Sequence, residues 1–343
     1  MSDRAEKIRL KRLADGILAA QGNVFIKEFL RDHGLRIGAT KSDFTRNLHA
    51  AIDEGKLTSG DIEEWLHRVE GWGSEHVYLY TVPARASKPE WGDPSAVEKA
   101  VRRAGLGHLW EAQSSLEFPE EPTLTGIYHR GEVVRFVWHE GSERLIRAPD
   151  QDPDDQVIDG DLYEFHAYRK ISERKVMRFD LRPKDRVAAA FVQVPLRSEE
   201  HKAAVAHLWE SVSFLVSLDD LVPLEVSSSI KTLDQEQLGQ DARPVLQSSQ
   251  TRLSGAGAYV EFGATSPGHR YGEVGPIREA RLALQLDEVT GKRATMFYAS
   301  PEGTGPPREV RVLLYADDRR VYVPARLTEE QMWQLLHVIR RAA

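Results

Sequence analysis

The chain has 343 residues, of which 41% are apolar and 29% are charged, so it is long enough to bury more than one hydrophobic core. It contains no cysteine, which excludes disulfides, thiolate metal sites and cysteine nucleophiles. The net charge of −7 excludes a protein whose whole surface binds nucleic acid. The charged start and the lack of a long apolar run predict a cytoplasmic protein that does not contact membranes.

Charge is distributed unevenly along the chain. Residues 1–50 contain ten Lys or Arg and six Asp or Glu, a local charge of +4. The rest of the chain therefore carries −11, the total of −7 less +4. This asymmetry is compatible with a basic N-terminal part that contacts DNA and an acidic body with another role.

Two amphipathic helices are expected, over residues 5–20 and 62–70. A helix-start cluster at 58–61 precedes the second one, and Gly71 ends it. Trp65 and Trp72 are expected in the core, because tryptophans at amphipathic spacing are more often buried than exposed as base-stacking platforms. The apolar residues of the two helices are Ile8, Leu13, Ile17, Leu18, Ile62, Trp65, Leu66 and Val69.

The segment from residue 25 to residue 48 is the most informative part of the sequence. Gly34 can adopt the left-handed conformation that ends a helix, and Thr40 can cap the next helix. The pattern predicts a helix, an extended loop and a second helix. Apolar residues recur at helical spacing before and after the loop, at Phe25, Ile26, Phe29, Leu30, Phe44, Leu48 and Ile52.

This segment resembles the SAP motif, a short DNA-binding helix–loop–helix. The motif has Gly-Leu, three residues, Gly-Thr-Lys and then two leucines, and this chain has Gly34-Leu35, Thr40-Lys41, Phe44 and Leu48 at those spacings. Ala39 stands at the second glycine, Gly38 lies one place earlier, and Asn47 replaces the usual basic residue. The resemblance covers about 25 of the 343 residues and implies a contact with DNA.

The chemistry of the segment also suits a phosphate backbone. Backbone N–H groups at the start of the helix after Thr40 carry the positive end of its dipole, which attracts anions. Contact through this segment alone would be weak and salt-sensitive. The alternative is an ordinary helical hairpin with a solvated basic face. The candidate DNA-binding residues are Lys41, Arg46, Arg36, Thr40, Ser42 and Lys27.

A domain boundary is expected after the helices. Residues 76–82 alternate like a strand, and residues 83–94 contain three prolines and form the best linker candidate. We therefore expect a first domain over 1–82 and a remainder that folds without it. The next helix is expected over 95–106, capped by Ser95.

From residue 123 the pattern is that of antiparallel hairpins. A helix over 199–217 closes the first set and a helix over 329–341 closes the second, where Thr328 and Gln331 form a capping box and Leu327 contacts Met332. The expected turns lie at Arg130–Gly131, Glu140–Gly141, 182–185, Thr290–Gly291 and 316–318.

This recurrence predicts a duplicated hairpin–hairpin–helix unit, once over 95–220 and once over 277–343. The alternative is that a common strand–Pro–helix junction occurs twice by chance. Residues 221–276 lie between the units, are rich in Ser, Gly and Gln, and are expected to form an irregular surface connection.

Catalytic and metal-binding patterns are weak. Asp150, Asp152, Asp154, Asp159 and Asp161 have the charge of a calcium loop but not its spacing. Pro153 and Asp155 stand where the loop needs flexibility and glycine, and no Glu ends it. Glu164 with Lys170, or Glu225 with Lys231, lacks the Glu-x-Lys spacing of a magnesium nuclease. We therefore expect no catalytic residue, no metal and no cofactor.

The sequence favours an α+β multidomain fold, with a small N-terminal helical module followed by an antiparallel-sheet body. The leading interpretation is a non-enzymatic DNA-associated protein whose module contacts the phosphate backbone and whose acidic body contacts protein partners or self-associates. One alternative is a metal-dependent nuclease, or another DNA-acting enzyme, with its site in the body. The other is a protein–protein adaptor that does not bind DNA.

Overall fold

The computed structural model describes residues 3–20, 22–71, 74–112, 119–193, 198–237, 245–253, 258–264, 274–284, 289–299 and 309–343. N-terminal helices precede a large antiparallel sheet, which confirms the expected α+β class. The chain forms two compact units. One contains Met1–Gly71, Ser114–Thr125 and Trp138–Val176, and the other contains the remaining residues. None of the helices in the described ranges is both long enough and apolar enough to cross a bilayer.

The N-terminal module consists of helices α1 (Asp3–Ala20), α2 (Asn23–Asp32), α3 (Lys41–Asp53) and α4 (Ser59–Glu70). Trp65 is buried and stacks on Phe29 with 4.0 Å between ring centroids, so its expected place in the core is confirmed. The expectation for Ile8 is wrong, because the buried stripe of α1 runs through Leu10, Leu13 and Ile17 and leaves Ile8 exposed. Trp72 lies outside the described residues.

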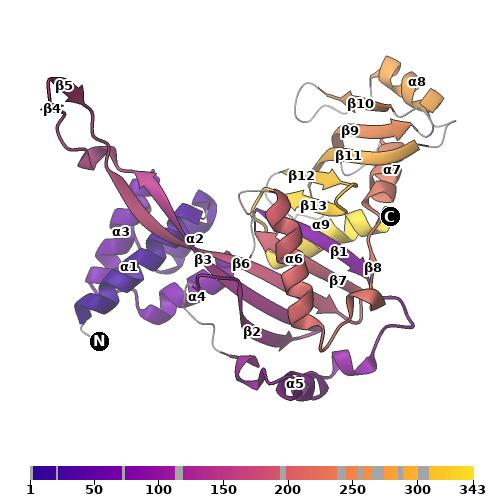
Figure 1. Ribbon diagram of the computed structural model, residues 1–343, viewed down its shortest axis with the longest axis horizontal. Coiled ribbons are helices and arrows are strands. Elements are labelled where there is room, and N and C mark those ends of the chain that lie inside the picture. The colour runs from indigo at the N-terminus through magenta and orange to yellow at the C-terminus, as the bar shows by residue number, and fades with distance from the viewer. Residues whose placement is uncertain are drawn as a thin grey trace. The chain divides into compact units, whose positions relative to one another are not determined.

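One continuous antiparallel sheet forms the body, in the strand order β10-β9-β11-β12-β13-β1-β7-β6-β3-β2, with β8 beside β1 (Figure 1). Its strands are β1 (Glu75–Thr81), β2 (Thr123–Arg130), β3 (Val133–Arg147), β6 (Tyr168–Arg182), β7 (Val187–Gln193), β8 (Val222–Pro223), β9 (Val245–Leu253), β10 (Tyr259–Gly263), β11 (Val289–Tyr298), β12 (Val310–Tyr315) and β13 (Arg320–Val323). Strands β4 (Gln156–Ile158) and β5 (Asp161–Tyr163) form a separate hairpin.

Strand β1 lies in the middle of this sheet. It pairs along its full length with β7, and Glu75, His76 and Val77 also pair with β13. The expected first domain over 1–82 therefore needs correction: the helices of the module end at Glu70, and the strand that follows belongs to the sheet. The sequence alternation predicted the strand but not its partners, which are more than a hundred residues away.

Two helices cover opposite faces of the sheet. Successive residues of a strand point to opposite sides. Val77 and Leu79 belong to the core that includes Leu335 and Leu336 of α9 (Glu329–Arg341). Alternate residues contact α6 (Ser198–Val212), where Tyr80 lies 5.0 Å from Trp209. Figure 1 shows α6 crossing in front of the strands. Both helices were expected.

The start of α9 also follows the expectation. The Thr328 hydroxyl accepts from the Gln331 N–H at 3.3 Å, and the Gln331 side chain accepts from the Thr328 N–H at 3.0 Å. Leu327 and Met332 are both buried in the core, on either side of this capping box. At α5 (Pro94–Arg103) the expected helix is present, but its cap is Asp93, which accepts from the N–H of Ser95.

Three of the five expected turns are confirmed, at 130–132, 183–186 and 316–319. The other two predictions are wrong, because Glu140–Gly141 lies inside β3 and Thr290–Gly291 lies inside β11. A Cβ added to Gly291 would lie 2.6 Å from the carbonyl oxygen of Ser227. This glycine therefore permits close packing of helix α7 (Val226–Glu236) on β11, and a turn is not its role.

The expected irregular connection over 221–276 is also wrong. It contains α7, β9, β10 and the start of α8 (Gly275–Leu284), and α8 occupies the place of an expected strand. In the described part of 277–343, the strands before α9 are β11, β12 and β13, so the two hairpins expected for the second unit are not both present there. Polar residues in β9 obscured the alternation that identifies a strand. Ser249 of β9 is buried, and its hydroxyl donates to Asp234 at 2.8 Å. Asp234 also pairs with Arg281 of α8.

Short 3₁₀ helices complete the described structure. They are η1 (Pro89–Gly92), η2 (Gly107–Leu109), η3 (Pro149–Gln151) and η4 (Leu218–Asp220). The expected linker over 83–94 is thus partly ordered, and Trp91 within it is fully buried.

The position of β1 predicts how truncated chains behave. A fragment that lacks residues 1–73 should unfold cooperatively, whereas a fragment that lacks residues 1–94 should not, because it loses the strand that joins β7 to β13. Thermal unfolding of both fragments, followed by circular dichroism, measures this. Equal cooperative transitions would mean that the sheet does not need β1.

Candidate functional site

The helix–loop–helix over α2 and α3 has the predicted geometry. Gly34 adopts a left-handed conformation with φ of 63° after the last turn of α2. The N–H of Leu35 donates to the carbonyl oxygen of Leu30 at 2.8 Å, which closes the end of the helix. Thr40 caps α3, since its hydroxyl accepts from the N–H of Asp43 at 3.2 Å. The loop from residue 35 to residue 40 is extended or bent and contains no helix.

Gly38 has a steric role in this loop. The Asp43 carboxylate folds back and accepts from the N–H groups of Ala39 and Thr40 at 3.2 and 3.1 Å. A Cβ on Gly38 would lie 2.1 Å from the Asp43 Cβ, so only glycine leaves room for this side chain. The hydrogen bonds from the Thr40 backbone and hydroxyl hold the pKa of Asp43 below its usual value. Its negative charge weakens the attraction for anions that we expected at the start of α3.

Three of the six candidate DNA-binding residues make structural contacts within the module or are half-buried. Lys41 donates from Nζ to the carbonyl oxygen of Leu18 at 2.9 Å, which ties α3 to α1. Thr40 is the helix cap, and Lys27 is half-buried on α2. Lys41 is exposed but also binds the Leu18 carbonyl oxygen, so replacing it would affect packing as well as charge.

The other three candidates are exposed around the start of α3. Arg46 has a side chain that is 73% exposed, and it lies 3.5 Å from Asp43 on the same helix. Ser42 is in the first turn of α3, and Arg36 is in the loop. The Asn47 amide donates to the carbonyl oxygen of Arg36 at 2.7 Å, which fixes the loop against α3. Thr40 and Lys41 are exposed as well, so Arg36, Ser42 and Arg46 are the exposed candidates that neither cap α3 nor tie it to α1.

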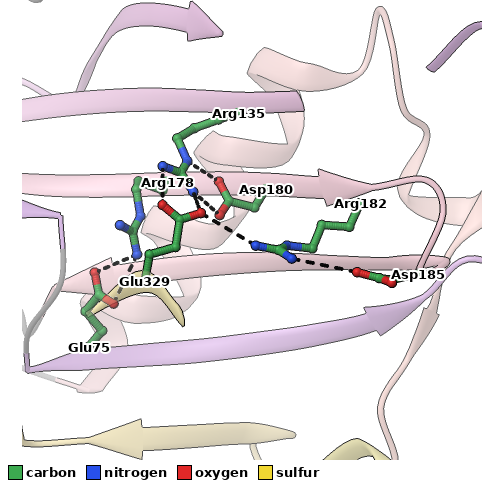
Figure 2. Close-up of polar contacts among 7 residues, drawn as sticks. All are labelled: Glu75, Arg135, Arg178, Asp180, Arg182, Asp185 and Glu329. Carbon is green, nitrogen blue, oxygen red and sulfur yellow. Dashed lines mark hydrogen bonds and ion pairs between the residues drawn. The ribbon is translucent and has the colours of Figure 1, made fainter. Parts of the chain in front are cut away.

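Sequence reasoning missed a buried ion-pair network on the α9 face of the sheet. Figure 2 shows how its side chains point toward one another. They are Glu75 of β1, Arg135 of β3, Arg178, Asp180 and Arg182 of β6, Asp185 of the following turn and Glu329 of α9.

Arg135 is the centre of this network. Its Nε and Nη2 donate to the two oxygens of Asp180 at 2.7 and 2.8 Å, and its Nη1 and Nη2 donate to Glu329 at 3.1 and 2.6 Å. Two bidentate contacts to one guanidinium fix both carboxylates. Arg182 continues the chain of charges, at 3.5 Å from Glu329 and 3.7 Å from Asp185. The network therefore fastens the first turn of α9 to β3 and β6.

Glu75 and Arg178 form the most deeply buried pair. Arg178 donates from Nη2 to both oxygens of Glu75, at 3.3 and 3.2 Å. Burial raises the pKa of Glu75 to about 7, although the nearby Arg178 acts in the opposite direction. For Asp180, burial alone would raise the pKa, but the pairing with Arg135 outweighs burial and lowers it. Asp180 is therefore charged at neutral pH, whereas the pKa of Glu75 lies close to neutral pH.

The network has a structural character. The carboxylates of Glu75, Asp180 and Glu329 each face a guanidinium. The signal in the sequence is the alternation Arg178-x-Asp180-x-Arg182, which places three charges on one face of a central strand. Charges on a buried strand face require partners, and this requirement could have identified the network.

A cavity of about 860 Å³ adjoins Arg182 and α9. Trp333, His337, Arg340 and Tyr298 are among its lining residues. Its cations are already engaged: Arg182 lies over the Trp333 ring at 4.2 Å, and Arg340 donates to the carbonyl oxygen of Asp185 at 2.9 Å. The lining therefore offers mixed charges without a clear preference for one ligand.

The residue pairs considered for a nuclease have other partners. Lys170 pairs with Glu143, Glu164 lies 3.5 Å from His166, and Glu225 lies 3.0 Å from Arg319. Asp152, one of the five aspartates considered for calcium, pairs with Arg147. Within the part of the chain that the structure describes, no three His, Asp or Glu side chains form a group that could hold a metal ion.

A buried histidine pair lies on the α6 face of the sheet. His76 of β1 and His201 of α6 have ring centroids 3.9 Å apart, and Tyr322 stacks on His76 at 4.5 Å. Burial lowers the pKa of His76 to about 3, and the positive charges of His201 and Arg320 contribute to the same shift. His76 is therefore neutral in the folded protein throughout the physiological pH range.

Substitution of Gly38 tests the loop geometry. Gly38→Ala should displace the Asp43 cap and destabilise α3 locally by about 1 kcal/mol, which accelerates hydrogen exchange of the α3 amides about fivefold. Mass spectrometry after hydrogen exchange measures this rate. Gly22→Ala is the matched control, because a Cβ there would meet no atom within 4 Å. Equal exchange in both variants would contradict the assigned role of Gly38.

Acid should destabilise the protein through His76. Below pH 6.5 the unfolded chain binds a proton at this histidine and the folded chain does not, so the free energy of unfolding falls as the pH falls from 6.5 towards 3. The loss is at most about 1.4 kcal/mol per pH unit. Urea unfolding at several pH values should show a smaller acid loss for His76→Phe. His337→Phe, at an exposed position, should behave like the parent.

No protein-family model matches this chain, and no curated protein is similar to it.

Proposed function

We propose that the protein is a non-enzymatic, cytoplasmic DNA-associated protein. Its N-terminal module contacts the phosphate backbone through the start of α3, and the rest of the chain contacts a protein partner. The observation that carries the proposal is the group of exposed residues Arg36, Ser42 and Arg46 on a helix–extended loop–helix whose two ends are fixed by hydrogen bonds.

The proposed contact has a physical basis in fixed geometry. The Asn47 amide joins the Arg36 backbone to α3 one residue after Arg46, so the loop position of Arg36 is fixed against the helix that carries Arg46. Phosphate contacts from arginines and from hydroxyl groups position a protein on the duplex without reading its sequence. The local charge of +4 over residues 1–50 favours approach to DNA, while the Asp43 carboxylate limits the strength of the contact. We therefore expect weak, salt-dependent affinity.

The two alternatives give different outcomes in simple assays. If the body contains a DNA-acting enzyme, the protein will cleave or modify plasmid DNA in the presence of Mg²⁺. If the protein is non-enzymatic, as proposed, the plasmid will stay intact. An adaptor without DNA binding would show no binding to duplex DNA at low salt. The carboxylates of the ion-pair network are paired with arginines, which favours a structural role for them over a catalytic one.

Charge reversal at Arg46 tests the proposed contact. Arg46→Glu should weaken duplex binding by the full chain and reduce the slope of log affinity against log salt by about one, because one phosphate contact is lost. Fluorescence anisotropy over a salt series measures both quantities. We prefer Arg46 to Lys41 because the Lys41 side chain also binds the Leu18 carbonyl oxygen.

Lys56→Glu is the matched control for this experiment. It changes the net charge equally, its side chain is 64% exposed, and it lies beyond the other end of α3, whose last residue is about 10 Å from Arg46 along the helix axis. The control should bind with nearly the parent slope. If both reversals weaken binding equally, only diffuse charge is involved, and the α3 contact is refuted.

A further inference from the structure

Strands β3 and β6 continue into an arm that ends in an unusual surface. Strand β6 pairs with β7 only over Met177–Arg182, and its earlier half runs with β3 towards the hairpin of β4 and β5 (Figure 1). We call residues 148–167 the acidic tip. It contains seven Asp or Glu and no Lys or Arg, so its charge of −7 equals the net charge of the whole chain.

The acidic tip also exposes large apolar side chains. Val157 and Leu162 face each other across the hairpin and are 69% and 71% exposed. Ile158, Tyr163 and Phe165 are exposed beside them. An isolated two-stranded hairpin is at best marginally stable in water, and adjacent exposed apolar side chains mark interaction sites. These residues therefore offer an apolar centre with an acidic rim.

The hairpin is fixed in spite of this exposure. Asp159 and Gly160 have φ values of 52° and 92°, the conformation of a tight two-residue hairpin turn. At the base, Arg147 pairs with Asp152 and donates to the carbonyl oxygen of Ala167 at 3.2 Å. Asp152 also accepts from the N–H of Ala167 at 2.7 Å. The apolar pair is thus presented by a preformed element.

Charge decides which partner suits this surface. Nucleic acids and anionic lipid surfaces carry the same sign as the tip, and two tips would repel each other at −7 each. A protein surface with an apolar centre surrounded by Lys and Arg has complementary charge and shape. We propose that the acidic tip docks on such a basic, apolar protein surface, with Val157 and Leu162 at the centre of the contact.

This inference specifies the protein contact that is part of the proposed function, and it does not depend on the DNA contact of α3. Aspartates at the rim should increase the association rate and its salt dependence. The apolar pair should supply the part of the affinity that survives at higher salt. These two contributions can be separated with defined probes.

Two labelled synthetic peptides serve as probes for the full-length protein. In one, lysine alternates with leucine, and in the other, lysine alternates with serine. The parent should bind the lysine–leucine peptide roughly tenfold more tightly, because burying apolar side chains contributes on the order of a factor of ten. Fluorescence anisotropy at two salt concentrations measures the difference. Equal binding of both peptides would overturn the proposal.

Variants of the tip locate the contact. Val157→Ser with Leu162→Ser should remove most of the preference for the leucine peptide and leave the thermal transition unchanged, since both residues are exposed. Val222→Ser with Leu282→Ser is the matched control, at apolar residues that are 50% and 48% exposed elsewhere. A preference that survives the first pair, or disappears with the second, would refute the assignment to the tip.

Two further measurements distinguish the remaining outcomes. If sedimentation shows that the parent is a dimer and that Val157→Ser with Leu162→Ser is a monomer, the partner is a second copy and the proposal is overturned. Arg46→Glu should bind the leucine peptide like the parent, and the tip variant should bind duplex DNA like the parent. Failure of the DNA contact and failure of the tip contact are therefore separately visible.

Discussion

The pairing of β1 with both β7 and β13 is the constraint on which the body depends. Each of those strands leads to a helix, and the two helices cover opposite faces of the sheet. Because β1 alternates between the faces, Val77 and Leu79 contribute to one core and His76 and Tyr80 to the other. A single strand of seven residues thus joins two halves that are made by distant parts of the chain.

Local signals in the sequence predicted most single elements and few of their partners. The caps at Thr40 and Thr328 were correct because capping depends on residues three positions apart. Gly291 was misread because its role depends on the backbone of α7, some sixty residues earlier in the chain. The buried Ser249 was missed for the same reason, since its partners Asp234 and Arg281 come from two separate helices.

The candidate site shows the same division. The sequence pattern selected the α2–α3 segment, and the structure has the expected helices there. The pattern did not predict that Lys41 binds the Leu18 carbonyl oxygen or that the Asp43 carboxylate occupies the start of α3. The hairpin of the acidic tip had a local signal in Asp159-Gly160 between apolar residues, which was obscured by the resemblance of the aspartates to a calcium loop. The ion pairs of Arg135 required the sheet order and could not be predicted locally.

The place of β1 has a consequence during synthesis. Ser74, just before β1, meets Tyr322, which is 248 residues later, and β13 pairs with Glu75–Val77, so this part of one edge of β1 has no partner until nearly the whole chain has been made. At 5–20 residues per second, this wait lasts on the order of 10 to 50 seconds. Contacts of such long range also slow folding after release. During that interval the open part of the strand edge can pair with other chains, so an incomplete chain is exposed to aggregation that the finished sheet prevents.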